Sequence, residues 1–250
     1  IFHSLRYLEH LDALDVPVLN GATAFRYELS KAAQYSLMAR LGIRHPATRV
    51  LSRPDQAPAA TEGLRFPVLV KPNIGGSGAG IQSFVSREEL EASVAAGSLG
   101  FGIDHVGLLQ EHLPARGDAI VRIEILDGRY LYAIRLLLSP GTFNLCPADY
   151  CDLPAMADSV SGRGLPIEAF DPPAELVEEA RRLVAAAGMD VGGVEYLVND
   201  RDGEAYFYDL NALSNFVADA PNVIGFNPCE DLAALIVARA GLVSGGVTAA

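Results

Sequence analysis

The stretch GGVEYLVNDRDGEAYFYDLNALSNF, residues 192–216, constrains the fold of this chain more than any other segment. Two runs of alternating polar and apolar residues flank an Asn-Asp-Arg-Asp-Gly turn at 199–203, which predicts a hairpin of two antiparallel strands. Pairing through this turn places Glu195 roughly opposite Asp209. Asp209 and Asn211 are two residues apart and therefore share one face of the second strand. Three oxygen-bearing side chains are thus expected on one patch.

This patch is a candidate metal site. Two carboxylates that face each other across a hairpin repel unless a cation lies between them. Oxygen ligands without a nearby His or Cys favour Mg²⁺, with Mn²⁺ as an alternative, and Mg²⁺ usually completes its shell with water and nucleotide phosphates. The alternative interpretation is a solvated sheet face without a metal.

A second informative segment is FPVLV-KPNIGGSGAG, residues 66–80. The short apolar run predicts a buried strand that ends at Lys71, and the glycines then predict a loop. Such glycines permit positive φ angles and bring N–H groups close to a phosphate. The spacing fits neither a Walker motif nor a dinucleotide fingerprint, so a mobile hairpin turn remains the alternative.

Lys31 is a third candidate. Ser30 is the expected N-cap of a helix whose apolar residues recur at helical spacing until Gly42. A lysine in the first turn opposes the helix dipole at a cost of about 0.3 to 1 kcal/mol. Lys31 is therefore either solvated or held there to meet an anion.

The remaining elements complete an α+β pattern. We expect a helix to about residue 14 with a strand at 16–19, strands at 47–52, 80–85 and 106–113, and a hairpin of 118–126 and 129–138 around Asp127-Gly128. Ser86 and Glu89 predict a capping box, and Asp171 predicts the cap of a helix that ends at Gly188. Residues 139–170 lack periodicity and are expected to form a mobile, functional loop.

Composition narrows the class of protein. The chain has 250 residues, half of them hydrophobic, and a net charge of -12 with a pI near 4.8. That charge argues against nucleic acid or an acidic membrane surface as a partner. No apolar run reaches the ~18 residues of a membrane span, no signal-peptide pattern opens the chain, and three cysteines fit a reducing compartment, so we expect a cytoplasmic protein.

The ordered motifs resemble the ATP-grasp superfamily over about residues 16–240, with the glutathione-synthetase and α-L-glutamate-ligase-like branch as the best fit. These motifs are a lysine at a helix start, strand-Lys-Pro with a glycine loop, Gln-Glu-x-Leu, and a Glu…Asp-x-Asn hairpin. The resemblance implies two α+β subdomains, 21–109 and 110–250, that grip ATP between antiparallel sheets. Residues 1–20 would be the end of a preceding α/β domain, and the chain does not begin with methionine.

The resemblance also implies roles for individual residues. The nucleotide would be held by Lys31, Lys71, Gly75, Gly76, Ser77, Gly78, Gly80, Gln110, Glu111, Leu113 and Asp118. The lysines and the glycine loop would contact phosphates, residues 110–113 the adenine, and Asp118 the ribose. The metal ligands would be Glu195, Asp209 and Asn211. Arg122 and Arg135 would clamp phosphate or an acyl-phosphate intermediate, and Asn144 would contact substrate.

Three features depart from the relatives. Gly193 stands where some ligases of the superfamily have an arginine, so the charge that stabilises transfer must come from elsewhere. The two metal carboxylates are Glu then Asp instead of Asp then Glu. The substrate loop FNLCPADYC contains Cys146 and Cys151, which are too few for a structural zinc site and are expected to be buried and unreactive.

The implied function is an ATP- and Mg²⁺-dependent carboxylate–amine ligase that forms an amide or peptide bond through an acyl phosphate. Its partners would be small-molecule acids and amines, with a homo-oligomer left open. A nucleotide-binding regulatory module without ligase activity is the alternative, and a different ATP-grasp chemistry such as carboxylation is a third.

Overall fold

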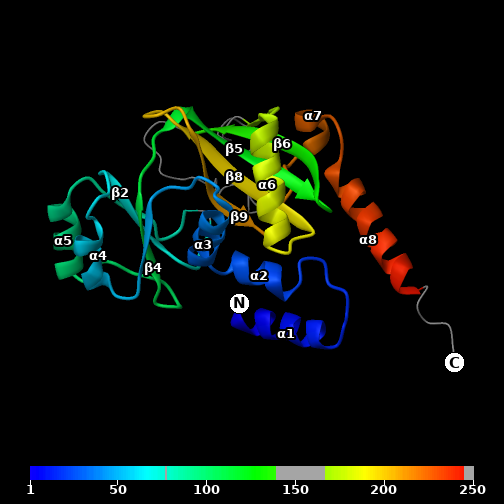
Figure 1. Cartoon of the computed structure of the whole chain (residues 1–250), viewed down its shortest axis with the longest axis horizontal. Coiled ribbons are helices and arrows are strands. Elements are labelled where there is room, and N and C mark those ends of the chain that lie inside the picture. The colour runs from blue at the N-terminus through cyan, green and yellow to red at the C-terminus, as the bar shows by residue number, and fades with distance from the viewer. Residues whose placement is uncertain (77, 139–166, 245–250) are drawn as a thin grey trace, which may run out of the picture.

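The fold comes from a computed structural model that describes residues 1–76, 78–138 and 167–244. Within these residues the strands form two separate antiparallel sheets, seen at the left and right of Figure 1. The smaller sheet has the order β1-β4-β2-β3 and the larger β7-β6-β5-β8-β9. This is the α+β arrangement of two sheets that the sequence predicts.

The smaller sheet is built from short strands. These are β1 (Thr48–Leu51), β2 (Val68–Pro72), β3 (Gln82–Phe84) and β4 (Gly107–Glu111). One of its faces buries Val68, Val70 and Leu109 against helices α4 (Ala57–Ala60) and α5 (Arg87–Ala95), which follow the short 3₁₀ turn η1 (Pro54–Gln56). Lys71 and Gln110 alternate with these residues and so face the other way.

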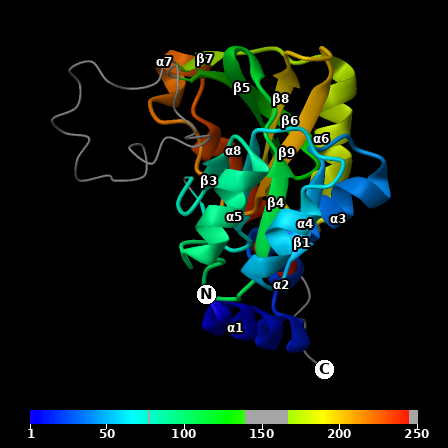
Figure 2. The same ribbon diagram turned by 90° about the vertical axis from the view of Figure 1, so that its left-hand side faces the viewer.

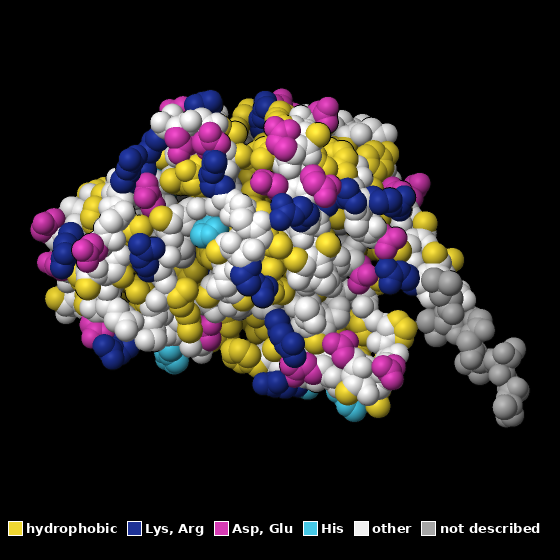
Figure 3. All heavy atoms as spheres, viewed as in Figure 1, with side chains coloured by type: hydrophobic (Ala, Val, Ile, Leu, Met, Phe, Trp, Pro, Cys, Tyr) yellow, Lys and Arg dark blue, Asp and Glu magenta, His cyan; other side chains and the backbone are white. Residues whose placement is uncertain are grey.

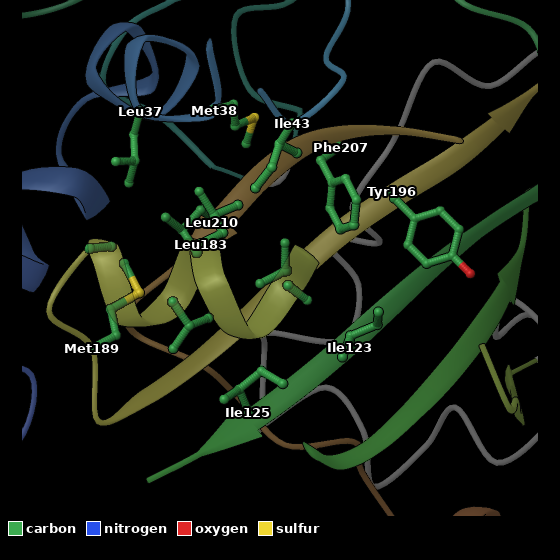
Figure 4. Packing of buried hydrophobic residues seen from close by; sticks show 14 of the residues in the cluster. Leu37, Met38, Ile43, Ile123, Ile125, Leu183, Met189, Tyr196, Phe207 and Leu210 are labelled. Atoms are coloured by element: carbon green, nitrogen blue, oxygen red, sulfur yellow. The ribbon is translucent and has the colours of Figure 1, made fainter. Parts of the chain in front are cut away.

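The larger sheet has longer strands. These are β5 (Ala115–Leu126), β6 (Arg129–Leu137), β7 (Ile167–Ala169), β8 (Val191–Asn199) and β9 (Ala205–Asn211). Helices α3 (Lys31–Leu41) and α6 (Ala174–Ala186) cover one face, where Leu37, Ile123 and Leu183 are almost inaccessible to solvent (Figure 4). Helices α7 (Ala220–Ile224) and α8 (Pro228–Ser244) follow the last strand.

The amino-terminal helices lie outside the sheets. Figures 1 and 2 place α1 (Phe2–Ala13) beside α2 (Ala22–Glu28) at one end of the molecule, and none of the residues of α1 is buried. Asn20 fastens the connection between them, since its side chain donates to Val191 O at 2.7 Å and accepts from Asp190 N at 2.8 Å. Helix α3 then packs on the larger sheet, although the sequence groups residues 21–109 as one subdomain. That division stays a prediction.

Most predicted elements are confirmed. Both hairpins form, and Glu195 pairs with Asp209 as expected. Ser30 caps α3 by accepting from Ala33 N at 3.2 Å, and Gly42 ends this helix with φ of 69°. These elements form where the sequence predicts them because the helix caps, the turn residues and the polar–apolar alternation all favour the same structure at these positions.

Three local predictions are wrong. Residues 16–19 are not a strand, since Pro17 cannot donate to a ladder and Asn20 turns the chain with φ of 56°. Asp171 does not cap α6, which begins at Ala174 because proline at 173 keeps residue 172 out of the helical region. The capping box is half formed: Ser86 accepts from Glu89 N, but the Glu89 carboxylate accepts from Val85 N, at 2.9 Å, instead of Ser86 N.

The surface agrees with the composition. Positive and negative side chains are interspersed over the face shown in Figure 3. In the described part of the chain, no helix is both long and apolar enough to cross a membrane.

Candidate functional site

A pocket lies where the two sheets meet, with a space of about 470 Å³ that is partly open to solvent. The glycine loop after β2 forms one wall and the strands β8 and β9 form another. Its lining includes Lys31, Lys71, Gly75, Gly76, Gly78, Glu195, Tyr208 and Asp209. Lys31 and Lys71 are the only lysines in the 250-residue sequence. Apart from histidine, every other basic residue is an arginine. Both lysines therefore line one pocket together with two of the expected metal ligands.

Lys31 is held at the start of α3 by contacts to β9 of the larger sheet and to the segment just after β2 of the smaller sheet. Its ammonium forms an ion pair with the Asp209 carboxylate. Asn73, just after β2, accepts from Ala32 N at 2.8 Å, while its backbone carbonyl accepts from Lys31 N at 3.2 Å. Burial opposes the charged form of Lys31, but the Asp209 charge outweighs it and raises the pKa of this lysine. Lys31 is thus a fixed cation at a helix start.

Lys71 lies in a different environment. Its side chain is 5% exposed, and its ammonium donates to the Tyr35 hydroxyl at 2.9 Å. Burial, with a smaller contribution from the Lys31 charge, lowers the pKa of Lys71 to about 7. Near neutral pH, Lys71 therefore exchanges between charged and uncharged forms until an anion enters the pocket.

The acidic pair depends on a bulge. Glu195 pairs with Asp209, but Tyr196 pairs with Phe207, so Tyr208 is the extra residue of β9. Without this bulge Asp209 would share the face of Phe207, which is buried under the helices. The bulge therefore turns both Tyr208 and Asp209 toward the pocket.

The two carboxylates influence each other. Burial, together with the Asp209 charge, raises the pKa of Glu195. Burial also opposes ionisation of Asp209, but Lys31 outweighs it and lowers the Asp209 pKa. A cation bound between them would relieve the repulsion on Glu195.

The donor set fits a hard divalent cation. Two carboxylates come from neighbouring strands, and Asn211 lies on the same face, where its amide donates to Gly193 O at 3.4 Å. Among the described residues no group of three or more His, Cys, Asp or Glu could hold a metal, so Asn211 and ligand oxygens would have to complete the shell.

Arg122 joins this group from β5. Its guanidinium contacts Glu195 at 3.1 Å, Glu124 at 2.6 Å and the Ser214 hydroxyl at 2.9 Å. Burial opposes its charge, but the two carboxylates raise the pKa of Arg122 further above its ordinary value. The arginine therefore stays charged beside the acidic pair.

Arg135 does not join the group, which corrects the expectation of an arginine clamp. Arg122 pairs with Ile134, so Arg135 on the next position of β6 faces the opposite side of the sheet. There its guanidinium lies 4.0 Å from the centre of the Phe170 ring and forms an ion pair with Glu168 at 3.1 Å. Two arginines on adjacent strands can clamp one ligand only when the strand register places both side chains on the same face of the sheet.

The residues expected around adenine and ribose are spread along the connection between the sheets. Gln110 is buried, and its amide donates to the Tyr35 hydroxyl at 2.7 Å, so the side chain is already engaged. Glu111 forms an ion pair with Arg201 at 2.8 Å, and Leu113 packs in the apolar cluster of the larger sheet. Asp118 is exposed, with φ of 48°. Nucleotide contacts by these residues stay predictions.

Gly78 and Gly80 of the loop have positive φ angles of 71° and 75°, which suit a phosphate-binding turn and an ordinary hairpin turn alike, so phosphate contacts by this loop stay a prediction. Gly75 and Gly76, at the start of the loop, are exposed to solvent. Ser77, Asn144, Cys146 and Cys151 lie outside the described residues.

Several residues that shape the pocket were not predicted from the sequence: Tyr35, Asn73, Glu124, Tyr208 and Ser214. The alternation in YFYDLN gave a signal, because Phe207 and Asp209 cannot share a face if one is buried and the other binds a cation. Tyr35 and Glu124 gave none, since a helical tyrosine and a strand glutamate are ordinary.

Comparisons with known proteins define the class. No protein-family model matches the chain. It is 27% identical to the D-alanine–D-alanine ligase of Geobacter sulfurreducens over 83% of this chain and 62% of that protein. It is 24% identical to a probable α-L-glutamate ligase of Aliivibrio salmonicida over 80% of this chain and 61% of that protein. The chain thus spans less than two thirds of the length of these relatives.

Solved structures agree on the fold. The ATP-grasp ligase PsnB, complexed with a minimal precursor, superposes with a TM-score of 0.67 and 19% identity, covering 93% of this chain and 67% of that chain. A D-alanine–D-alanine ligase from Bacillus anthracis gives a TM-score of 0.61 and 20% identity over 84% of this chain and 65% of that chain. The chain therefore has an ATP-grasp fold. Its ordered motifs and its relatives support membership of the ATP-grasp ligase superfamily.

Proposed function

We propose that this chain is the catalytic core of an ATP- and Mg²⁺-dependent carboxylate–amine ligase. The observation that carries the proposal is one pocket that gathers both lysines of the sequence, a glycine loop and the facing Glu195–Asp209 pair. Relatives named as D-alanine–D-alanine ligase and α-L-glutamate ligase support an amino acid or a peptide as the amine substrate.

The reaction would have two steps. An oxygen of a substrate carboxylate attacks the γ-phosphorus of ATP, and the bond to ADP breaks to leave an acyl phosphate. An amine then attacks the acyl carbon, phosphate leaves, and the amine loses a proton as the amide forms. Neither step requires a nucleophilic side chain, so the protein acts by positioning and by neutralising charge.

The residues divide this work. Lys31 and Lys71 would meet the phosphate oxygens that gain charge, and Arg122 would stabilise the transferred group from β5. The glycine loop would donate N–H groups and exclude water. Glu195, Asp209 and Asn211 would hold Mg²⁺, which supplies further charge neutralisation on the phosphates.

Lys71 has a distinctive part in this scheme. Its pKa near 7 leaves Lys71 only partly charged beside Lys31 at neutral pH before a nucleotide binds. Polyphosphate oxygens would draw a proton onto it, so the full positive charge would arise only when the nucleotide binds.

The test is a screen for ADP formation with amino acids and dipeptides as acid and amine. A pair that supports turnover is then offered with ¹⁸O in its carboxylate, and the label is traced. The proposal requires ¹⁸O in the released phosphate. Nucleotide binding without turnover on any pair would favour the regulatory module, and label retained in the amide product alone would contradict the acyl phosphate.

The proposal extends to the cellular location, the partners and the oligomeric state of the protein. The cysteine content and the expected small-molecule substrates support a cytoplasmic enzyme without nucleic-acid or membrane partners. Size-exclusion chromatography with light scattering would decide between a monomer and a homo-oligomer.

A further inference from the structure

The guanidinium of Arg122 lies directly on the backbone of Gly193. A Cβ atom built on this glycine would lie 2.5 Å from Nη2 and 2.8 Å from Cζ of the arginine. Gly193 pairs with Glu124 across β5 and β8, so the arginine leans diagonally over the neighbouring strand. The absence of a side chain at position 193 is therefore what makes room for the guanidinium.

The guanidinium divides its donors unequally between two carboxylates. Nε donates to Oε1 of Glu124 at 2.6 Å, and Nη2 donates to the Ser214 hydroxyl at 2.9 Å. Ser214 in turn donates to Oε2 of Glu124 at 2.5 Å, which closes a ring. Only Nη1 reaches Glu195, at 3.1 Å.

This division matters because an arginine and a carboxylate prefer a bidentate contact through two parallel hydrogen bonds. Here the Nε and Nη2 edge, which would form such a contact, is occupied by Glu124 and Ser214. Glu124 is 1% exposed, so its charge is poorly screened and holds the arginine firmly. Glu195 receives a single, longer contact, although it is the pairing partner of Arg122 across the strands.

We propose that Glu124, assisted by Ser214, is a positioning residue that holds Arg122 on the Gly193 backbone and thereby keeps the Glu195 carboxylate available to a divalent cation. This inference rests on the proposed function, because it assigns a partner to the proposed metal site. Without Glu124, the guanidinium turns its free edge to Glu195 and competes with the metal for the same carboxylate.

The experiment measures Mn²⁺ binding by electron paramagnetic resonance, with a nonhydrolysable ATP analogue present. Glu124→Gln keeps the size of the side chain and removes its charge, and we expect the affinity for Mn²⁺ to fall about tenfold, as for other partners of metal ligands. Ser214→Ala should produce a smaller loss in the same direction. Gly193→Ala displaces the guanidinium and should also weaken binding of Mn²⁺.

A double variant separates positioning from general damage. If Glu124 acts by restraining Arg122, then Arg122→Met added to Glu124→Gln removes the competitor and restores affinity for Mn²⁺. A role in structure alone would leave the double variant as weak as the single one. Glu204→Gln is the matched control, because Glu204 forms an ion pair with Arg44 on the surface. This variant should bind Mn²⁺ with the same affinity as the parent.

The outcomes are distinguishable. Equal Mn²⁺ affinity in the parent and Glu124→Gln, or no recovery in the double variant, overturns the inference while the proposed function stands. A parent that binds neither Mn²⁺ nor nucleotide overturns both. If Glu124→Gln fails to give a cooperative thermal transition, Ser214→Ala carries the test, and unchanged affinity for Mn²⁺ in that variant overturns the inference.

Discussion

Nucleotide binding should be accompanied by proton uptake at Lys71. In the empty pocket, burial and the Lys31 charge hold the pKa of Lys71 at about 7. Phosphate oxygens next to the ammonium favour its charged form and return this pKa toward the ordinary value for lysine. The group therefore takes up a proton when the nucleotide binds, and the amount depends on pH.

The magnitude follows from that pKa. At pH 8 about one tenth of Lys71 is protonated before binding, so uptake should approach about 0.9 proton per site. At pH 7 the uptake should be about half a proton, and at pH 6 only about 0.1. Uptake at this site therefore increases as the pH rises from 6 to 8.

The assay is isothermal titration calorimetry with a nonhydrolysable ATP analogue in two buffers of different ionisation enthalpy. The difference in observed heat gives the number of protons exchanged. Lys71→Gln is titrated in parallel, because subtraction removes protons exchanged by the nucleotide itself. Equal uptake in the parent and Lys71→Gln at pH 8, or a difference that falls as the pH rises, would refute the reasoning.

Three further predictions concern the pocket and its support. Asp209→Asn and Asn211→Ala should each raise the Mg²⁺ concentration needed for ADP formation, whereas a Mg²⁺ titration like that of the parent would show a merely solvated sheet face. Tyr35→Phe leaves the buried donors of Lys71 and Gln110 without their shared acceptor, so urea unfolding should show a loss of about 1 to 3 kcal/mol; unchanged stability would contradict this. Asn144→Ala should weaken use of the carboxylate or amine substrate and spare ATP-analogue binding, and the reverse pattern would place that loop elsewhere.

Much of the fold was accessible from the sequence because its signals are local. The Asp127-Gly128 turn, the Ser30 cap and the 199–203 turn specify their elements through backbone geometry that neighbouring residues alone determine. The turn at 199–203 specifies the hairpin, but the pairing of Glu195 with Asp209 also requires the bulge at Tyr208. The residue at which an element begins was harder to predict, because α6 begins at Ala174 and is not capped by Asp171.

The environment of the site depended on contacts between distant segments. Arg135 and Arg122 were indistinguishable as strand arginines, and only the strand register separates their faces. The Tyr35–Lys71 hydrogen bond joins residues 36 positions apart and changes the chemistry of the lysine without a sequence signal. Glu124 is likewise recognisable only beside Arg122 and Ser214.

The central claim, that the pocket between the sheets binds the phosphates of ATP, is tested most directly by a lysine-directed probe. An ATP derivative with a lysine-reactive acyl group on its terminal phosphate is incubated with the protein near pH 7.5, and labelled peptides are mapped by mass spectrometry. Only Lys31, Lys71 and the terminal amine offer primary amines in this sequence. We predict a label on Lys71 that Mg²⁺-ATP suppresses and that Lys71→Arg abolishes. Labelling confined to the terminal amine, or labelling of Lys71 that excess Mg²⁺-ATP leaves unchanged, would contradict the claim.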